Sequence, residues 1–238
     1  MLPLHAGALH SRSEHTRAML ARVGYARGTF VGRIELSPRI TRDERRAVTF
    51  WLRRMPPGFE ERLPPLKLAV AEELRVGRSQ VWINEIPEGL AAGPEDLLHA
   101  ASFIPERYLV LNRRLFARRV ELGRILYHEL SHFVWTRLGN PKRKSYEALV
   151  RADFRERKRG ELGYSSEWRK RELREAGKGV PRNSKYWREY ICESFCDTAA
   201  YVLLGSERRA GHSEYTLNRK ARERRKRWMA EQVSGVRC

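Results

Sequence analysis

Apolar residues recur at helical spacing between Arg114 and Leu138, and this pattern predicts one continuous helix. The helix should end at Gly139-Asn140-Pro141, where a glycine favours termination and a proline cannot continue the helix. From Ile125 to Trp135 the helix is apolar nearly all round, which is typical of a buried helix. The strongly polar exceptions are His128, Glu129, Ser131 and His132. Burying ionisable groups is costly without compensation, so these residues mark a site.

A second apolar helix is predicted from Asn183 to Leu204, with Asn183 or Ser184 as N-cap and Gly205 closing it. Its apolar face includes Trp187, Ile191, Phe195, Ala199 and Val202. An adjacent stripe carries Tyr190, Glu193, Asp197 and Tyr201. Two carboxylates on a largely apolar helix suggest a function, although two exposed acids on an amphipathic helix would give the same pattern.

The rest of the chain predicts shorter elements and an α+β fold. We expect a small N-terminal sheet region followed by a mostly helical region that holds both apolar helices, divided into residues 1–60 and 61–238. Strands are expected at 28–36, 80–86 and 106–112 and helices at 13–23, 41–55, 145–158 and 216–232, with a helical turn at 94–101. Residues 160–180 are polar and punctuated by glycine, which indicates a loop.

Composition narrows the class of protein. The chain has 238 residues, 41% of them hydrophobic, which is a globular balance. No stretch approaches the roughly 20 apolar residues of a membrane span, and the N-terminus lacks the pattern of a signal peptide. The three cysteines cannot all pair within one chain, which favours a reducing compartment. We therefore expect a cytoplasmic protein.

The net charge of +19 is concentrated after the first apolar helix and includes a basic C-terminal helix. Such a charge attracts nucleic acid or another polyanion. No nucleic-acid-binding motif accompanies it, so a solvated, arginine-rich surface is an equal alternative.

The spacing of the polar residues suggests a zinc site. His128 and His132 lie four residues apart, so both imidazoles project from one helix face and could bind Zn²⁺. Glu129 can reach a water beside the metal without being a ligand. Glu193 would complete the ligand set, and Asp197, one turn later, could accept the free ring N–H of either histidine. Cys192 and Cys196 also suit a metal, but small core residues are the better interpretation of both.

These motifs resemble the gluzincin class of zinc metallopeptidases, which carry HExxH on one helix and Glu-x-x-x-Asp on a later one. The matching residues are His128-Glu129-Leu130-Ser131-His132 and Glu193-Ser194-Phe195-Cys196-Asp197. The resemblance extends from about Glu106 to Leu204. It implies His128, His132 and Glu193 as metal ligands, Glu129 as general base and Asp197 as the residue behind the ligands.

The resemblance also implies a substrate-binding edge strand before the first helix. Residues 106–112 occupy that place, and Asn112 could anchor a substrate carbonyl, although an internal strand fits the pattern equally well. Gluzincins stabilise the oxyanion with a tyrosine or histidine after the third ligand. Tyr201, His212 and Tyr190 are the candidates, with core tyrosines and a plain loop histidine as the alternatives.

The favoured function is hydrolysis of peptide bonds in a peptide or protein substrate by a metal-activated water, with Glu129 as general base. One alternative is a SprT-like, nucleic-acid-associated metalloprotease, but such proteins use a third histidine, and none stands in Gly163-Tyr164-Ser165-Ser166-Glu167-Trp168. The other alternative is a non-catalytic, basic nucleic-acid-binding protein.

Overall fold

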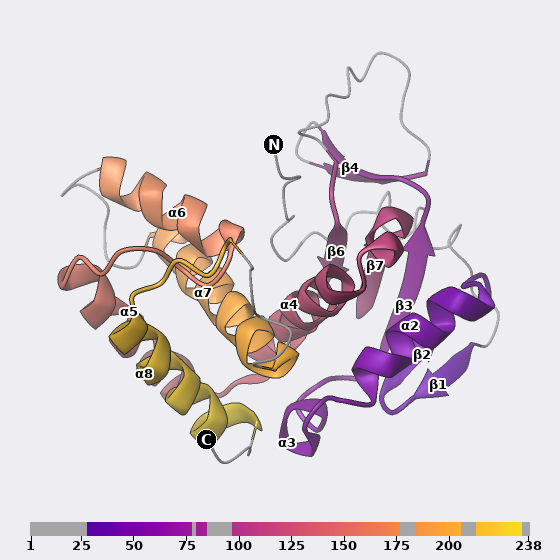
Figure 1. Ribbon diagram of the computed structural model, residues 1–238, viewed down its shortest axis with the longest axis horizontal. Coiled ribbons are helices and arrows are strands. Elements are labelled where there is room, and N and C mark those ends of the chain that lie inside the picture. Colours follow the sequence, from indigo (N-terminus) through magenta and orange to yellow (C-terminus); the bar gives the residue numbers. More distant parts are fainter. Residues whose placement is uncertain (1–27, 78–79, 85–96, 177–183, 206–212, 235–238) are drawn as a thin grey trace.

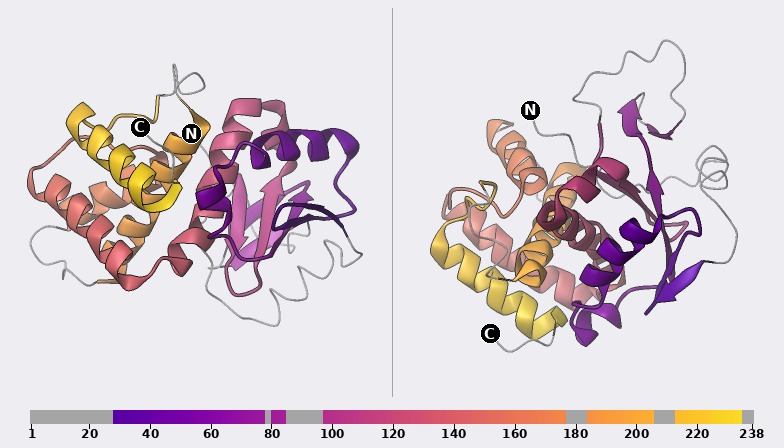
Figure 2. Two further views of the ribbon diagram at one scale, coloured as in Figure 1. Left: turned by 90° about the horizontal axis from the view of Figure 1, so that it is seen from below. Right: turned by 45° about the vertical axis from the view of Figure 1, so that its right-hand side comes forward.

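A computed structural model describes residues 28–77, 80–84, 97–176, 184–205 and 213–234, and within them the protein is α+β. The strands and α2 gather on one side of the molecule, and the last four helices gather on the other (Figures 1 and 2). Helix α4 (Arg119–Arg137) lies between the two sides and packs extensively against α7 (Lys185–Leu204). The expected fold class is confirmed.

The main sheet has five strands in the order β1-β2-β3-β7-β6. They are β1 (Thr29–Val31), β2 (Ile34–Leu36), β3 (Leu66–Ala71), β6 (Ala100–Phe103) and β7 (Tyr108–Asn112). Strands β2, β3 and β7 are parallel, and β1 and β6 run antiparallel at the two edges. A separate hairpin pairs β4 (Leu74–Gly77) with β5 (Gln80–Ile83). Strand β7 is therefore internal, and the prediction that residues 106–112 form the substrate-binding edge is wrong.

Alternation along the strands separates two apolar clusters, one on each face of the sheet. Ile34, Leu68 and Leu109 face α2 (Arg42–Leu52) and α4 in the main core. Ala69 and Val110 face a smaller cluster that contains Leu74 and Val81 of the β4–β5 hairpin. The sheet thus holds α4 firmly on one face, which fixes the position of the HExxH residues.

The remaining elements are α3 (Pro57–Glu60), α5 (Asn140–Arg155), α6 (Tyr164–Glu175), α8 (Arg219–Met229), a 3₁₀ turn η2 (Arg113–Ala117) and a final turn η5 (Ala230–Ser234). Three predictions need correction. The helix expected from Arg114 to Leu138 is divided at Arg118, whose non-helical φ and ψ separate η2 from α4. The loop expected at 160–180 contains α6. The helical turn expected at 94–101 is not found in its described part, residues 97–101, where strand β6 begins at Ala100. The helix expected at 13–23 lies outside the described residues.

Helix α4 lies unusually close to α2 at Gly123. A Cβ at this position would lie only 2.4 Å from the indole of Trp51, so a larger residue could not be accommodated without displacement. The Trp51 Nε1 donates to the Arg119 carbonyl at 3.1 Å, and the Tyr127 hydroxyl donates to the Trp51 carbonyl at 2.8 Å. These contacts set the rotation of α4 about its axis, and with it the direction of its histidines.

The helical side is joined by a buried ionic network as well as by apolar packing. Glu161 accepts hydrogen bonds from Tyr190 at 2.6 Å and ion-pairs with Lys170 at 2.9 Å and with Arg225. Arg225 also pairs with Asp153 at 3.0 Å, and all four charged groups are almost fully buried. The network ties α8 to α5, α6 and α7.

The sheet crosses the boundary that the sequence predicts near residue 60, because β2 pairs with β3. The main core likewise runs from Ile34 to Val233. Among the helices of the described ranges, none combines the length and apolar character needed to cross a bilayer.

Candidate metal centre

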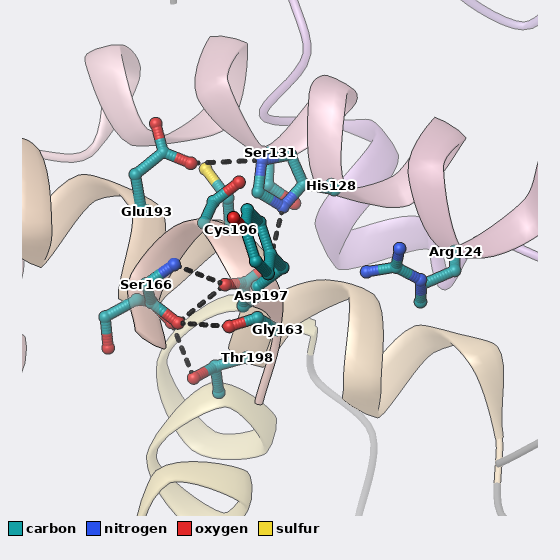
Figure 3. Close-up of polar contacts among 12 residues, drawn as sticks. Arg124, His128, Ser131, Gly163, Ser166, Glu193, Cys196, Asp197 and Thr198 are labelled. Atoms are coloured by element: carbon teal, nitrogen blue, oxygen red, sulfur yellow. Dashed lines mark hydrogen bonds and ion pairs between the residues drawn. The ribbon is translucent and has the colours of Figure 1, made fainter. Parts of the chain in front are cut away.

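The HExxH residues lie at the contact between α4 and α7 (Figure 3). His128, Glu129 and His132 are completely buried, and the two imidazole centroids lie 5.1 Å apart. The second helix begins after Ser184, whose side chain accepts from the Trp187 N–H, and ends at Gly205, as predicted. The two helices therefore bring residues that are distant in sequence into one buried polar cluster.

Glu193 reaches both histidines from α7. One carboxylate oxygen, Oε2, lies 3.2 Å from Nε2 of His128, and the other, Oε1, lies 3.9 Å from Nε2 of His132. Burial alone would raise the pKa of Glu193, but the Arg169 guanidinium and the two imidazoles outweigh it and hold that pKa well below its usual range. Glu193 is therefore ionised and able to serve as a ligand.

Asp197 orients His128 from behind. Its Oδ1 lies 2.8 Å from Nδ1 of His128, which leaves Nε2 directed toward Glu193. Its Oδ2 accepts from the backbone N–H of Ser166 at 3.1 Å and from the Ser166 hydroxyl at 2.6 Å, so the carboxylate sits at the N-terminus of α6 (Figure 3). Burial disfavours a charged imidazole, but Asp197 and Glu193 together raise the pKa of His128 well above its ordinary value.

Gly163 permits this contact. A Cβ at this position would lie 2.2 Å from Oδ1 of Asp197, closer than real side-chain contacts allow. The backbone of Gly163 is extended, a conformation that any residue can adopt. The glycine is therefore needed for the close approach of the Asp197 carboxylate and not for its backbone angles. The segment 163–168, which has no third histidine, thus supports the site by holding the Asp197 carboxylate.

Two cysteines of α7 face the other ring nitrogen of His132. Sulfur atoms of Cys196 and Cys192 lie 3.4 and 3.5 Å from Nδ1. A hydrogen bond from Cys196, with His132 nearby, lowers the pKa of the Cys192 thiol to about 6. Within the described residues, His128, His132 and Cys196 each offer a ligand atom, and these atoms lie within 4.8 Å of one another. This buried group could hold a metal ion.

The cluster contains buried polar atoms without hydrogen bonds to the described residues, as a metal site would. His132 Nε2, Glu193 Oε2 and Glu129 Oε1 are buried and make no hydrogen bond to the described residues. Unsatisfied buried polar atoms are rare and costly, and three of them in one cluster call for a compensating group. Imidazole, carboxylate and thiolate are donors that transition metals accept. The residues present therefore fit a metal ion.

Glu129 is held by a residue that the sequence did not reveal. The Ser102 hydroxyl, on strand β6, lies 2.7 Å from Oε2 and 3.1 Å from the main-chain carbonyl of Glu129. Burial raises the pKa of Glu129. Both histidines and the hydrogen bond from Ser102 lower it, but they offset only part of the rise. The signal for Ser102 was a polar residue within the apolar run Ala100–Phe103, whereas Gly163 and Ser166 lie in the segment whose pattern predicts a loop.

Two other predicted site residues have different roles. Asn112 is buried, with its Oδ1 accepting from Arg114 N–H and its Nδ2 donating to the Leu98 carbonyl, so it caps a turn instead of facing a substrate. Tyr190 donates its hydroxyl to Glu161 in the ionic network, which removes it as an oxyanion donor.

The remaining oxyanion candidates are Tyr201 and His212. Tyr201 packs edge to face on Tyr215, with ring centroids 5.0 Å apart, in a small cluster with Leu162 and Leu217. His212 lies outside the described residues. Comparison with protein-family models, curated proteins and solved structures finds no match for this chain.

Proposed function

We propose that the protein is a zinc-dependent peptidase of the gluzincin type. The observation that carries this proposal is the approach of one Glu193 carboxylate to Nε2 of both His128 and His132. Each histidine then has its second nitrogen engaged, by Asp197 or by the cysteine sulfurs, as is usual for metal-binding histidines. Glu129 lies beside this set, with one oxygen held by Ser102 and the other making no hydrogen bond within the described part of the chain.

The chain's own residues suit peptide hydrolysis. A zinc ion bound there would supply a Lewis acid that acidifies a nearby water and stabilises negative charge on a substrate carbonyl oxygen. Glu129 takes the proton of the attacking water on Oε1, the oxygen that bonds to none of the described residues, and passes it to the leaving amine. Ser102 keeps the carboxylate in place through Oε2. Complete burial strengthens these electrostatic interactions.

Strand β6 is the strand with which an extended substrate would pair under this proposal, and its four residues would have to be uncovered first, since all of them are buried in this structure. Among the described strands it pairs only with β7, so it is an edge of the sheet. It also carries Ser102, which contacts Glu129, so the edge lies beside the site. A peptide that adds a strand to β6 would bring its main chain past Glu129.

Cys196 is the competing third ligand, since it groups with both histidines. We favour Glu193, because its carboxylate faces Nε2 of both rings, whereas the closest contact of the Cys196 sulfur is with Nδ1 of His132. Cobalt substitution separates the two, because a thiolate ligand gives a sulfur-to-cobalt charge-transfer band. The Glu193→Gln variant should lose metal affinity, and Cys196→Ser should retain both the metal and the spectrum.

The decisive test compares the wild-type protein with Glu129→Gln, using zinc content by elemental analysis and cleavage of a degenerate peptide library. The variant should bind stoichiometric zinc and lose hydrolysis, because it keeps the ligands and lacks the base. Ser131→Ala is the matched control, since among the described residues its hydroxyl bonds to the Tyr127 carbonyl on the same helix. Full activity in Glu129→Gln would exclude the mechanism.

A further inference from the structure

A cavity of about 660 Å³ opens beside the candidate metal centre. It is formed by the end of α4, the start of α5, the middle of α6 and the first turns of α7. Both His132 and Glu193 line it, so the cavity reaches the proposed ligands even though both side chains are buried. Its size falls within the usual range for small-ligand sites.

The wall of this cavity is strongly basic. Four of its lining residues are cationic, namely Arg143, Arg169, Lys185 and Arg188. Against them stand two carboxylates. Glu189 lies 3.8 Å from Lys185, and Glu193 would be neutralised as a metal ligand. A bound dication would add further positive charge, so the cavity as a whole favours an anion.

Arg169 links the basic wall to the proposed reaction centre. Its Nη2 lies 3.7 Å from Oε1 of Glu193, and its guanidinium rests on the Trp168 ring at 5.2 Å. Its Nε is buried and makes no hydrogen bond to the described residues. A planar guanidinium with an unused buried donor is suited to a carboxylate.

We propose that this cavity binds a carboxylate of the peptide substrate next to the scissile bond, and that Arg169 and Arg188 determine this specificity. The inference rests on the proposed peptidase function and names its substrate class as acidic. The carboxylate can come from a glutamate or aspartate side chain or from the C-terminus of a peptide. These two sources correspond to an endopeptidase and a carboxypeptidase.

The test measures binding by fluorescence anisotropy at near-physiological salt, using the zinc-loaded Glu129→Gln full chain so that binding is read without cleavage. Three labelled peptides are compared: one with internal glutamates and an amidated C-terminus, its glutamine counterpart, and the glutamine peptide with a free C-terminus. We expect one of the two carboxylate peptides to bind about tenfold tighter than the amidated glutamine peptide, as one charge-assisted hydrogen bond would give. Which of the two does so identifies the source.

Charge-reversal variants in the wall of the cavity show whether the preference for a carboxylate peptide arises there. Arg188→Glu, or Lys185→Glu if the first variant is unstable, should bring the ratio of affinities close to one. Lys220→Glu is the matched control, because it makes the same charge change at an exposed site on α8. Equal affinities for all three peptides, or equal losses from Arg188→Glu and Lys220→Glu, would overturn the proposal. So would equally effective competition by an oligonucleotide of the same charge. Failure of the peptidase function would instead appear as an absence of zinc-dependent cleavage.

Discussion

Single residues behind the proposed ligands determine how well the ligands are oriented. Gly163 is the clearest case, because the Asp197 carboxylate occupies the space that any side chain at this position would need. Asp197 in turn holds Nδ1 of His128. The cost of a substitution at Gly163 should therefore appear in metal binding.

We predict that Gly163→Ala lowers zinc affinity about 10- to 100-fold, the usual effect of disturbing the residue behind a metal-binding histidine. Competition with a chelator of known affinity measures this change. Gly139→Ala is the control, since the added Cβ would meet Cδ of Pro141 at an ordinary contact distance of 3.7 Å. Unchanged zinc affinity in Gly163→Ala would mean that Asp197 does not position the site.

Ser102 has a corresponding role toward the proposed base. Ser102→Ala should lower kcat about tenfold, since a hydrogen bond to a charged group contributes about 1.4 kcal/mol or more. Zinc content and KM should remain near the wild-type values, because the hydroxyl contacts neither the histidines nor Glu193 in the hydrogen bonds described above. Steady-state kinetics with elemental analysis separates this result from a loss of folding.

At the scale of elements, sequence patterns located the two helices of the site and Asp197, but not the residues on other elements that hold the site in place. His128, His132 and Glu193 could be placed because their spacing fixes the face of a helix on which they lie. Ser102 and Asn112 could not be interpreted, because strand order decides which strand is the edge, and strand order depends on pairing between distant residues. Helix α6 was missed since its polar sequence has little apolar periodicity, and its position depends on contacts with α7.

The ionic network around Glu161 joins four helices, and it should govern stability in acid. Arg225 and Lys170 outweigh the effect of burial and lower the pKa of Glu161 to about 2. Because this pKa lies below the ordinary value of 4.5, the network's contribution is complete above pH 4.5. It is lost as the pH falls toward 2.

Glu161→Gln should lower the unfolding free energy at neutral pH by about 3–5 kcal/mol, because it removes the carboxylate that Arg225 and Lys170 share and leaves the buried network with one negative charge too few. The variant should also lose the part of the pH dependence that falls between 4.5 and 2. Urea unfolding across that range measures both effects. Glu156→Gln is the control, since Glu156 is exposed and should change stability little.

For the whole molecule, part of the basic charge has a structural use. Arg124, Lys170 and Arg225 are buried in ion pairs, and Arg224 pairs with Asp153. The basic residues thus include cations that hold helices together, and the three buried ones, Arg124, Lys170 and Arg225, are not available to an external polyanion. The number of exposed cations is smaller than the sequence suggests.

The proposed metal would join α4 to α7, so its removal should weaken the contact between the two sides of the molecule. Zinc at 100 times its dissociation constant would stabilise the folded state by about 2.7 kcal/mol. For a chain of this size, that corresponds to a rise of roughly 5–10 °C in Tm over the chelated protein. Differential scanning calorimetry should record this rise in the wild type and lose it in His132→Ala. A wild-type Tm that is indifferent to zinc would count against a buried ion.

The order in which the two helices leave the ribosome has a consequence for biosynthesis. A nascent chain that ends shortly after α4 presents two imidazoles on an apolar helix, with neither Glu193 nor the cysteines yet made. Metal captured at that stage would be held weakly, and the apolar surface would be open to aggregation. Under the proposed function, secure loading would wait until α7 has been synthesised and docked. Zinc shortage would then leave full-length chains in which α4 and α7 are loosely packed against each other.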